Sequence, residues 1–339
     1  MIAITGGGTG GHLSIVKSLK EELNKRGIKP VFIGSQNGQD KSWFENDTGF
    51  EEKYFFNTTG VVNKNKIGKI FSLFKIFLYS LKCFFIFKKH HIKKIISVGG
   101  YSAAAASFGA VLFKKELYIH EQNAKKGALN IKLSHYAIAT FSSYLSDSPV
   151  KDYPVNNRFF ELARERSSLG TIIFLGGSQG ASFINSLAMQ IAPKLLQKNI
   201  SIIHQCGKTQ YKQIKEYYKK NNLQVDLYDF TNDIPSLLNK ADISISRSGA
   251  STLWELCASR LPSIFIPFPY AASDHQYFNA KFLEEKKLAF ILRESEATSQ
   301  KVLNIINKID IKKINSLLPH TIHPNGSQKI IDFILTHHS

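Results

Sequence analysis

The chain has 339 residues, which is too long for one ordinary hydrophobic core and predicts two domains of about 150 residues each. Its hydrophobic share of 43% and its charged share of 21% exclude an intrinsically disordered protein. The formal charge of +18 indicates an anionic partner, either nucleic acid, an anionic membrane surface or a phosphorylated substrate. A general solubility charge is the alternative interpretation.

Short apolar runs alternate with amphipathic helical patterns along the chain, which predicts βα units and parallel sheets. A helix is expected over residues 13–26, and a last helix over 328–336. In the first half, strands are expected at 2–5, 31–33, 95–98, 117–119 and 136–139. In the second half, strands are expected at 171–175, 201–205, 243–246, 263–266 and 289–292, with a helix over 181–197.

The stretch 142–168 is rich in Ser, Pro, Asp and Asn and has little periodicity, so we expect the domain linker there. The predicted fold is α/β, with two Rossmann-like domains facing each other across a cleft. The first domain is expected over 1–156 together with a C-terminal helix at about 322–339, and the second over 157–321. The three cysteines lack metal or disulfide spacing, which fits a reducing cytosol, and no signal peptide is expected.

A first glycine loop (residues 6–11, Gly-Gly-Gly-Thr-Gly-Gly) follows the first predicted strand and precedes a helix. Glycines let the backbone approach a diphosphate, and the helix N-terminus supplies N–H donors. An NAD site would have an acidic residue at the end of the second strand, but that strand ends Ile33-Gly34-Ser35-Gln36. A tight turn with no ligand is the other alternative.

A second glycine loop (residues 176–180, Gly-Gly-Ser-Gln-Gly) repeats this arrangement in the other half. Two such loops facing one cleft suit a donor diphosphate on one side and an acceptor phosphate on the other. The pair is more specific than either loop alone.

Polar clusters follow three predicted strands, at the sheet edge where doubly wound folds bind ligands. They begin at His120, Arg247 and Asp274. Helix capping explains only one residue in each cluster. Glu255 follows the second cluster, and its carboxylate could accept hydrogen bonds from both hydroxyls of a ribose; a solvated helix residue is the alternative.

No Asp-x-Asp pair and no His/Cys cluster with metal spacing occurs in the sequence, so neither a metal nor another cofactor is expected. If the two glycine loops serve a transfer reaction, helix N-termini and backbone donors would stabilise the departing diphosphate in place of a metal, and Arg247 could add positive charge.

Six motifs in order resemble the MurG family of N-acetylglucosaminyltransferases, which convert lipid I to lipid II in peptidoglycan synthesis. The resemblance covers about residues 1–290. The motifs are Gly7-Thr9-Gly10-Gly11-His12, Val98-Gly99-Gly100-Tyr101-Ser102, His120-Glu121-Gln122-Asn123-Ala124, Leu175-Gly176-Gly177-Ser178-Gln179-Gly180-Ala181, Arg247-Ser248-Gly249-Ala250 and Asp274-His275-Gln276.

The resemblance implies a GT-B fold and inverting transfer of N-acetylglucosamine from UDP-GlcNAc to the muramyl-pentapeptide of lipid I. It also implies a peripheral membrane protein on the cytoplasmic face of the bacterial inner membrane. It places Gly99, Gly100 and Tyr101 at the acceptor diphosphate. The donor contacts it implies, with Arg247 added, are Thr9, Gly10, Gly11, Asn123, Ser178, Arg247, Glu255 and Gln276.

His12 is the candidate general base, because a histidine near its ordinary pKa can take a proton from the acceptor hydroxyl. Its alternative roles are to bind a phosphate or to orient the loop. The chain departs from the family at the domain junction, where Arg158 is left unassigned as a phosphate contact. It also departs at residues 231–234, where no single side chain is assigned to the uracil.

The segment 64–94 is apolar, aromatic and flanked by lysines. It is about long enough to span a bilayer, but on a helix Ser72, Lys75, Tyr79 and Lys82 form one polar stripe, and a lysine at mid-membrane costs about 3 kcal/mol. An amphipathic helix lying on an anionic membrane surface therefore fits better than a spanning helix. A buried helix of the first domain remains the alternative.

Other functions remain open within the same fold, namely a glycolipid glycosyltransferase and a UDP-sugar epimerase. A nucleic-acid-binding protein would explain the charge, but the sequence has no zinc finger or RNP-type aromatic motif. No nucleic acid is therefore expected as a partner.

Overall fold

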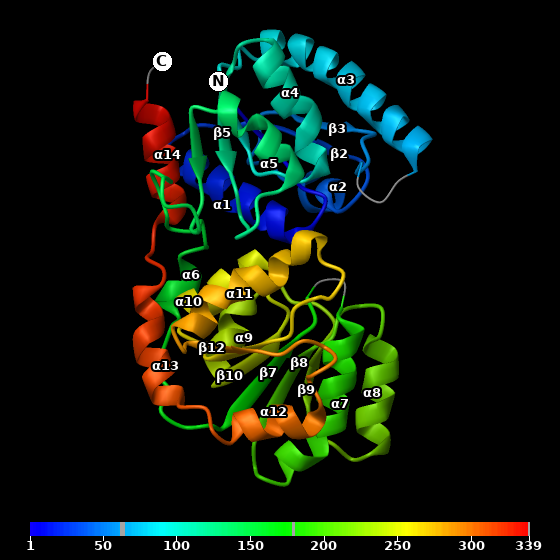
Figure 1. The fold of residues 1–339 in the computed structure, drawn as a ribbon, viewed down its shortest axis with the longest axis vertical. Coiled ribbons are helices and arrows are strands. Elements are labelled where there is room, and N and C mark those ends of the chain that lie inside the picture. The colour runs from blue at the N-terminus through cyan, green and yellow to red at the C-terminus, as the bar shows by residue number, and fades with distance from the viewer. Residues whose placement is uncertain (62–64, 178–179, 338–339) are drawn as a thin grey trace. The chain divides into compact units, whose positions relative to one another are not determined.

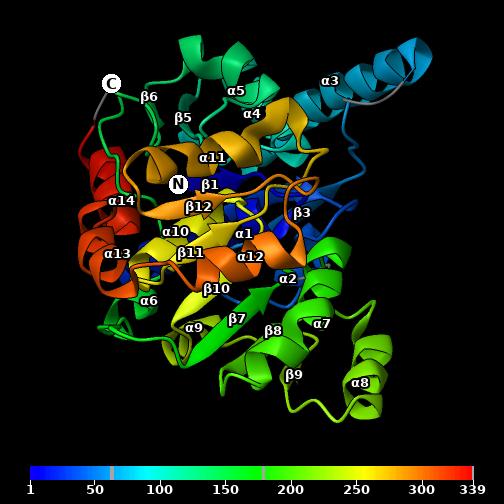
Figure 2. The same cartoon turned by 60° about the horizontal axis from the view of Figure 1, so that its bottom comes forward.

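The computed structural model describes residues 1–61, 65–177 and 180–337. The chain forms two compact units, the first comprising Met1–Val155 with Asn325–Ser339 and the second comprising Asn156–Pro324. Each unit has a six-stranded parallel sheet with helices on both faces (Figures 1 and 2). The predicted pair of Rossmann-like domains is thus confirmed.

The first unit has the strand order β3-β2-β1-β4-β5-β6. The strand numbers fall from β3 to β1 and then rise from β4, so the order reverses between β1 and β4 although all strands are parallel. Its strands are β1 (Ile2–Thr5), β2 (Val31–Ser35), β3 (Lys53–Phe56), β4 (Lys94–Ser97), β5 (Glu116–His120) and β6 (Ala139–Phe141). Its helices are α1 (Gly10–Lys25), α2 (Asp40–Phe44), α3 (Lys66–Lys89), α4 (Ala104–Leu112), α5 (Ala128–Leu133) and α14 (Gly326–Thr336), with 3-10 turns η1 (Tyr101–Ala103) and η2 (Ser134–Tyr136).

The second unit repeats that order as β9-β8-β7-β10-β11-β12. Its strands are β7 (Thr171–Leu175), β8 (Ser201–Gln205), β9 (Asp226–Tyr228), β10 (Ile243–Ser246), β11 (Ser263–Phe265) and β12 (Ala289–Ile291). Its helices are α6 (Arg158–Glu161), α7 (Ser182–Leu196), α8 (Tyr211–Lys220), α9 (Ile234–Lys240), α10 (Ala250–Ala258), α11 (His275–Glu285), α12 (Ser299–Ile306) and α13 (Ile311–Leu317), with 3-10 turns η3 (Ala272–Asp274) and η4 (Leu318–His320).

The central strands are continuous apolar runs because they are buried on both faces, as parallel sheets require. All four residues of β1 are buried, and Ile4 lies in register with Phe32 of β2 and Ile96 of β4.

The chain passes from the first unit to the second within the 142–168 stretch. Helix α14 belongs to the first unit again and packs on α1, where Arg26 pairs with Asp332 at 2.8 Å.

Three local expectations were wrong or incomplete. The strand expected at 136–139 is β6, which begins only at Ala139, because Ser134–Tyr136 forms a 3-10 turn after α5. The short strands β3 and β9 were missed. Helix α1 begins at Gly10, so the last two residues of the first glycine loop are already helical. Thr9, which precedes the helix, has extended backbone.

Helix α3 packs along α4 and buries one face, which combines small side chains with Ile76, Ile86 and Phe87, while most of its other large apolar side chains are exposed. Ser72, Ser80 and Cys83 are buried, and a Cβ on Gly109 of α4 would lie only 3.0 Å from the Cβ of Cys83. The helix is long and apolar enough to cross a membrane by length and composition, with a third of its apolar window buried. The predicted polar stripe is thus only partly right, since Ser72 is buried while Lys82 is exposed.

Candidate functional site

The first glycine loop lies at the carboxyl end of β1, beside the 99–100 turn that follows β4. This is the point where the strand order reverses, which is where doubly wound sheets bind ligands. The N–H of Gly7 donates to the carbonyl of Gly99 at 3.4 Å. A Cβ on Gly100 would lie 2.5 Å from the carbonyl oxygen of Gly7, so only glycine permits this close approach.

His12 lies in the first turn of α1, and both of its ring nitrogens have partners. Its Nδ1 is 3.0 Å from the Thr9 hydroxyl, and its Nε2 is 2.7 Å from the side-chain amide of Gln122. A Cβ on Gly99 would lie 3.5 Å from Nε2, so the imidazole borders the 99–100 turn. The structure therefore brings together two of the predicted motifs, the one with Thr9 and His12 and the one with Gly99 and Gly100.

The 120–123 cluster after β5 is held by a buried carboxylate. Glu121 accepts hydrogen bonds from the N–H of Asn123 at 3.0 Å, from the N–H of Gly127 at 2.8 Å and from the Asn130 amide at 2.8 Å. Burial raises the pKa of Glu121, against the lowering effect of these bonds. Burial, and next the charge of His12, lowers the pKa of His120 to about 3. These two residues thus shape the loop that carries Gln122 and Asn123.

Tyr101 supports the first glycine loop. Its hydroxyl donates to the backbone carbonyl of Asn37. A Cβ on Gly8 would lie only 2.7 Å from a carbon of the Tyr101 ring, so the ring packs directly against this glycine. Burial raises the pKa of this phenol, and the charge of Asp40 raises it further. Tyr101 was predicted to lie at the acceptor diphosphate, and here its hydroxyl is bound to the protein backbone.

The second glycine loop lies at the equivalent point of the second unit, after β7. Gln205 of β8 clamps it, because its side-chain oxygen accepts from the Gly177 N–H at 3.0 Å and its amide donates to the Gly177 carbonyl at 3.0 Å. Gly180 has φ of +79°, and a Cβ there would lie 2.7 Å from the carbonyl oxygen of Cys206. Ser178, the predicted donor contact of this loop, lies outside the described residues.

Arg247 and Gln276 meet at the loop that follows β11. The guanidinium of Arg247 donates to the carbonyls of Ile266 and Pro267 at 3.0 and 3.2 Å, pairs with Glu294, and lies 5.4 Å from the ring centre of Phe268. Gln276 accepts from the Phe268 N–H at 3.0 Å. Glu294 offsets part of the positive charge that Arg247 was expected to supply.

Glu255 lies in the second turn of α10, the helix that follows β10. Its side chain is partly buried, and burial raises its pKa to about 7. Within the described part of the chain, no hydrogen bond or ion pair reaches its carboxylate. A desolvated carboxylate without a protein partner is suited to accept hydrogen bonds from a ligand.

The junction residues left unassigned are paired with each other. Arg158 is 2.9 Å from Asp233, which also caps α9 by accepting from the Ser236 N–H at 3.3 Å. Asp40 and Gln205, which hold the two glycine loops, were not predicted as site residues, because no local motif distinguishes them.

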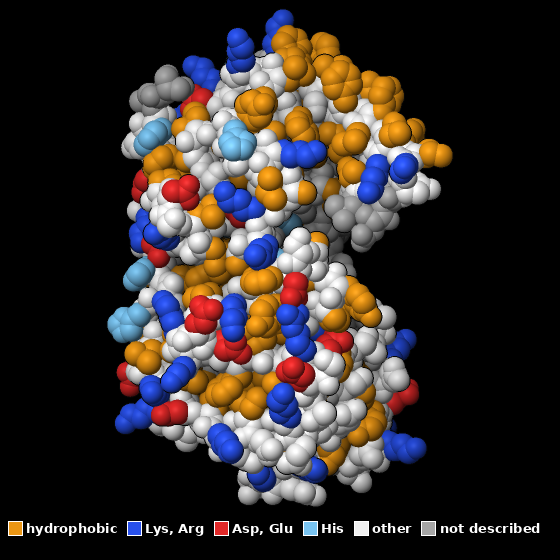
Figure 3. All heavy atoms as spheres, in the orientation of Figure 1, with side chains coloured by type: hydrophobic (Ala, Val, Ile, Leu, Met, Phe, Trp, Pro, Cys, Tyr) orange, Lys and Arg blue, Asp and Glu red, His pale blue; other side chains and the backbone are white. Residues whose placement is uncertain are grey.

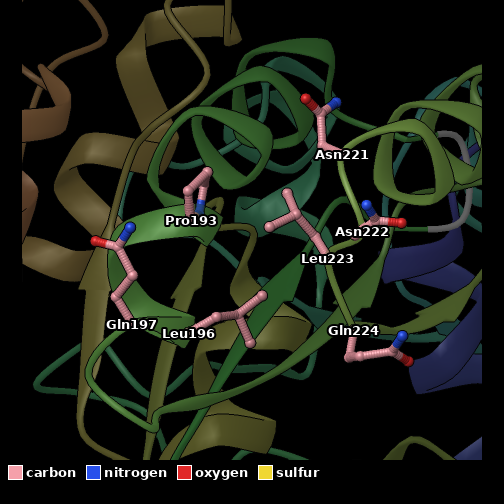
Figure 4. Close-up of a pocket in the computed structure, with 7 residues that line it drawn as sticks. All are labelled: Pro193, Leu196, Gln197, Asn221, Asn222, Leu223 and Gln224. Carbon is pink, nitrogen blue, oxygen red and sulfur yellow. The ribbon is translucent and has the colours of Figure 1, made fainter.

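Two surface hollows lie away from these groups. One, of about 440 Å³, lies between Pro193 and Leu196 of α7 and the 221–224 turn (Figure 4). The other, of about 650 Å³, includes Met1 and Lys93. Both are at the amino ends of the strands, opposite the glycine loops.

Among the residues described, no group of three or more His, Cys, Asp or Glu is arranged to hold a metal ion.

Two parallel sheets of the same order, each with a glycine loop where the order reverses, form the GT-B fold. The models of the glycosyltransferase family 28 N-terminal and C-terminal domains match residues 2–142 and 171–331. The chain belongs to glycosyltransferase family 28 and, within it, to the MurG family of N-acetylglucosaminyltransferases.

Individual relatives support the same assignment. A UDP-N-acetylglucosamine–N-acetylmuramyl-(pentapeptide) pyrophosphoryl-undecaprenol N-acetylglucosamine transferase of Campylobacter hominis is 52% identical over 334 residues, covering 98% of this chain and 97% of that protein. The transferase of the same name from Campylobacter fetus is 52% identical and covers 99% of each chain. The crystal structure of Acinetobacter baumannii MurG matches with a TM-score of 0.79 and 25% identity over 99% of each chain.

Proposed function

We propose that the protein transfers N-acetylglucosamine from UDP-GlcNAc, with inversion, to the muramyl-pentapeptide of lipid I and so produces lipid II for peptidoglycan. The observation that carries the proposal is the 52% identity over 98% of the chain to a transferase named for this reaction. The two glycine loops at the switch points are consistent with it, since the donor and the acceptor each contain a diphosphate.

On the donor side, Glu255 would accept hydrogen bonds from the ribose hydroxyls, and Ser178 with its glycine loop would contact the diphosphate. Arg247 and Gln276 would contact the donor from the neighbouring loop. Thr9, Gly10, Gly11 and Asn123 would complete the donor contacts from the first unit. Helix N-termini would stabilise the charge that develops on the departing UDP.

On the acceptor side, the 99–100 turn and Tyr101 would hold the lipid diphosphate while His12 removes the proton of the attacking hydroxyl. Thr9 and Gln122 occupy both imidazole nitrogens in this state. The acceptor hydroxyl would therefore replace one of them. The oxygen then forms its bond to the anomeric carbon as the bond from that carbon to the UDP oxygen breaks.

A substrate panel tests the proposal against its alternatives. UDP-GlcNAc would be incubated with a lipid I analogue, with diacylglycerol or with no acceptor, and the products separated by chromatography. We expect a labelled disaccharide-lipid with the lipid I analogue only. A labelled diacylglycerol product would favour a glycolipid transferase, and a changed UDP-sugar without acceptor would favour an epimerase.

Helix α3 would attach the protein to the cytoplasmic face of the inner membrane. Exposed apolar side chains cover its outer surface, as seen at the upper right of Figure 3. Phe74, Phe77 and Phe85 are 56%, 54% and 70% exposed. Lysines at both ends, including Lys66 and Lys88, would attract anionic lipid headgroups.

Replacing Phe74, Phe77 and Phe85 together with Ser is expected to lower partitioning into anionic vesicles by at least about tenfold, because three rings no longer enter the lipid. Vesicle sedimentation measures this, and UDP affinity should not change. The control is Trp43→Ser, which removes an aromatic residue of α2 that is 37% exposed. Unchanged sedimentation of the triple variant would contradict membrane attachment through α3.

Replacing Gln205 with Ala is expected to weaken UDP binding about tenfold, because removal of two hydrogen bonds frees the Gly177 peptide, at a cost of about 1–2 kcal/mol. Titration calorimetry with UDP measures the change. The control is Gln190→Ala on α7, whose side chain accepts from the Ser299 hydroxyl at 2.8 Å and does not touch the loop. Equal UDP affinity in both variants would show that the clamp does not serve the donor.

A further inference from the structure

Asp40 lies beneath the first glycine loop as the first residue of α2. Its side chain is fully buried, with 0% exposure. One carboxylate oxygen accepts the Gly8 N–H, and the other accepts the Ser35 N–H at 2.8 Å. A Cβ on Gly7 would lie 2.5 Å from the carboxyl carbon of Asp40, so the carboxylate fills the space that a side chain would need.

The Gly7–Gly8 peptide links this carboxylate to the 99–100 turn. The N–H and the C=O of a trans peptide point in opposite directions, so an N–H that faces Asp40 directs the Gly7 carbonyl away from it. That carbonyl abuts Gly100, and the Gly7 N–H donates to Gly99. The orientation of one peptide thus sets the first glycine loop against the turn.

Such a loop needs an anchor because glycine has much conformational freedom to lose. Gly6, Gly7 and Gly8 all have positive φ, of 131°, 153° and 86°. Hydrogen bonds to an ionised carboxylate are roughly twice as strong as neutral ones. Burial raises the pKa of Asp40, while the bonds from Gly8 and Ser35 oppose that rise and favour the ionised form.

We propose that Asp40 is a positioning residue of the acceptor half-site. It holds the Gly7–Gly8 peptide so that this part of the first glycine loop and the 99–100 turn together receive the acceptor diphosphate beside His12. The nature of the ligand rests on the proposed function. The anchoring itself rests on the hydrogen bonds of Asp40 alone.

Asp40→Asn tests the proposal with almost no change of shape. An amide has one acceptor oxygen, so the Gly8 or the Ser35 N–H must face an NH₂ group. We expect the acceptor KM for a lipid I analogue to rise about tenfold, with UDP affinity changed less than about twofold. Hydrogen exchange of the peptide spanning residues 5–12 should become faster.

The matched control is Asp47→Asn in the same unit. Asp47 also accepts a backbone N–H, from Gly49 at 2.8 Å, and binds Lys20, but it does not touch the glycine loop. The Asp47→Asn variant should leave the acceptor KM and the hydrogen exchange of residues 5–12 unchanged. If Asp40→Asn does not fold, Asp40→Ser keeps one acceptor oxygen and serves as the second variant.

The two readouts separate this proposal from the proposed function. If the wild-type protein makes no product, the function fails, and exchange of residues 5–12 alone decides whether Asp40 anchors the loop. Unchanged exchange in a folded Asp40 variant would overturn the proposal. So would an unchanged acceptor KM in an active variant, or an equal loss of UDP affinity, which would indicate a general structural defect.

Discussion

Replacing His12 with Gln should lower kcat by about 10²- to 10⁴-fold, because general-base catalysis by a positioned side chain contributes about that much. UDP affinity should change less than about threefold, since the imidazole is expected to act on the acceptor hydroxyl. Glutamine can still bond to Thr9 or Gln122, which occupy the imidazole nitrogens at 3.0 and 2.7 Å. Loop geometry is therefore kept while the base is lost.

The pH profile separates a base from an orienting residue. In the wild-type protein, the rate should fall as pH decreases and the imidazole becomes protonated, and this limb should disappear in His12→Gln. Exposed His135 of the 3-10 turn η2 provides the control, since His135→Gln should keep both the rate and the limb. A kcat within threefold of the wild type, or an unchanged acid limb, would contradict the assignment of His12 as the base.

Replacing Glu255 with Gln should weaken UDP binding by about 10- to 100-fold at pH 8, because a hydrogen bond to a charged group contributes about 1.5–3 kcal/mol. The pKa of about 7 adds a pH dependence. Wild-type UDP affinity should fall as pH decreases below about 7 and the carboxylate becomes protonated. The variant should show no such dependence.

Glu255→Gln weakens UDP binding but should increase the stability of the folded protein above pH 7. Burial raises the pKa of Glu255 from 4.5 to about 7, so the folded protein holds this proton more tightly than the unfolded chain does. The resulting stability is full below pH 4.5 and is lost as pH rises through about 7. Above pH 7, Glu255→Gln should therefore raise the free energy of unfolding relative to wild type, by at most about 3 kcal/mol.

Denaturant unfolding at pH 5 and pH 8 measures this difference, which should be much smaller at pH 5 than at pH 8. Glu285→Gln on α11 is the control, because Glu285 is exposed and its substitution should change neither stability nor UDP affinity. Equal UDP affinity for wild type and Glu255→Gln at pH 8 would contradict the ribose role.

The sequence predicted the parts of the fold that depend on local pattern. Central strands such as Ile2–Thr5 and Thr171–Leu175 are continuous apolar runs, so their bounds were predicted correctly. The edge strand Asp226–Tyr228 was missed because it has three residues and is only partly buried, which leaves little apolar signal. Periodicity likewise placed α3 but could not show which of its side chains pack against α4.

In the candidate site, the residues that belong to sequence motifs were predictable, whereas the residues that hold these motifs in place were not. His12 and the 99–100 turn belong to recognisable motifs, and the strand order places them together. Asp40 and Gln205 act across neighbouring strands of the sheet, from positions 32 and 28 residues away from the backbone groups they bind. A single polar residue at that separation has no spacing signal, so tertiary contacts alone reveal it.

Mass spectrometry of the product formed from UDP-GlcNAc and a lipid I analogue, with EDTA present, tests the central claim most directly. We expect a lipid-linked disaccharide in which one N-acetylglucosamine has been added, with formation of UDP in equal amount. If the folded protein forms no such product, in detergent and in membranes alike, it does not transfer N-acetylglucosamine to lipid I.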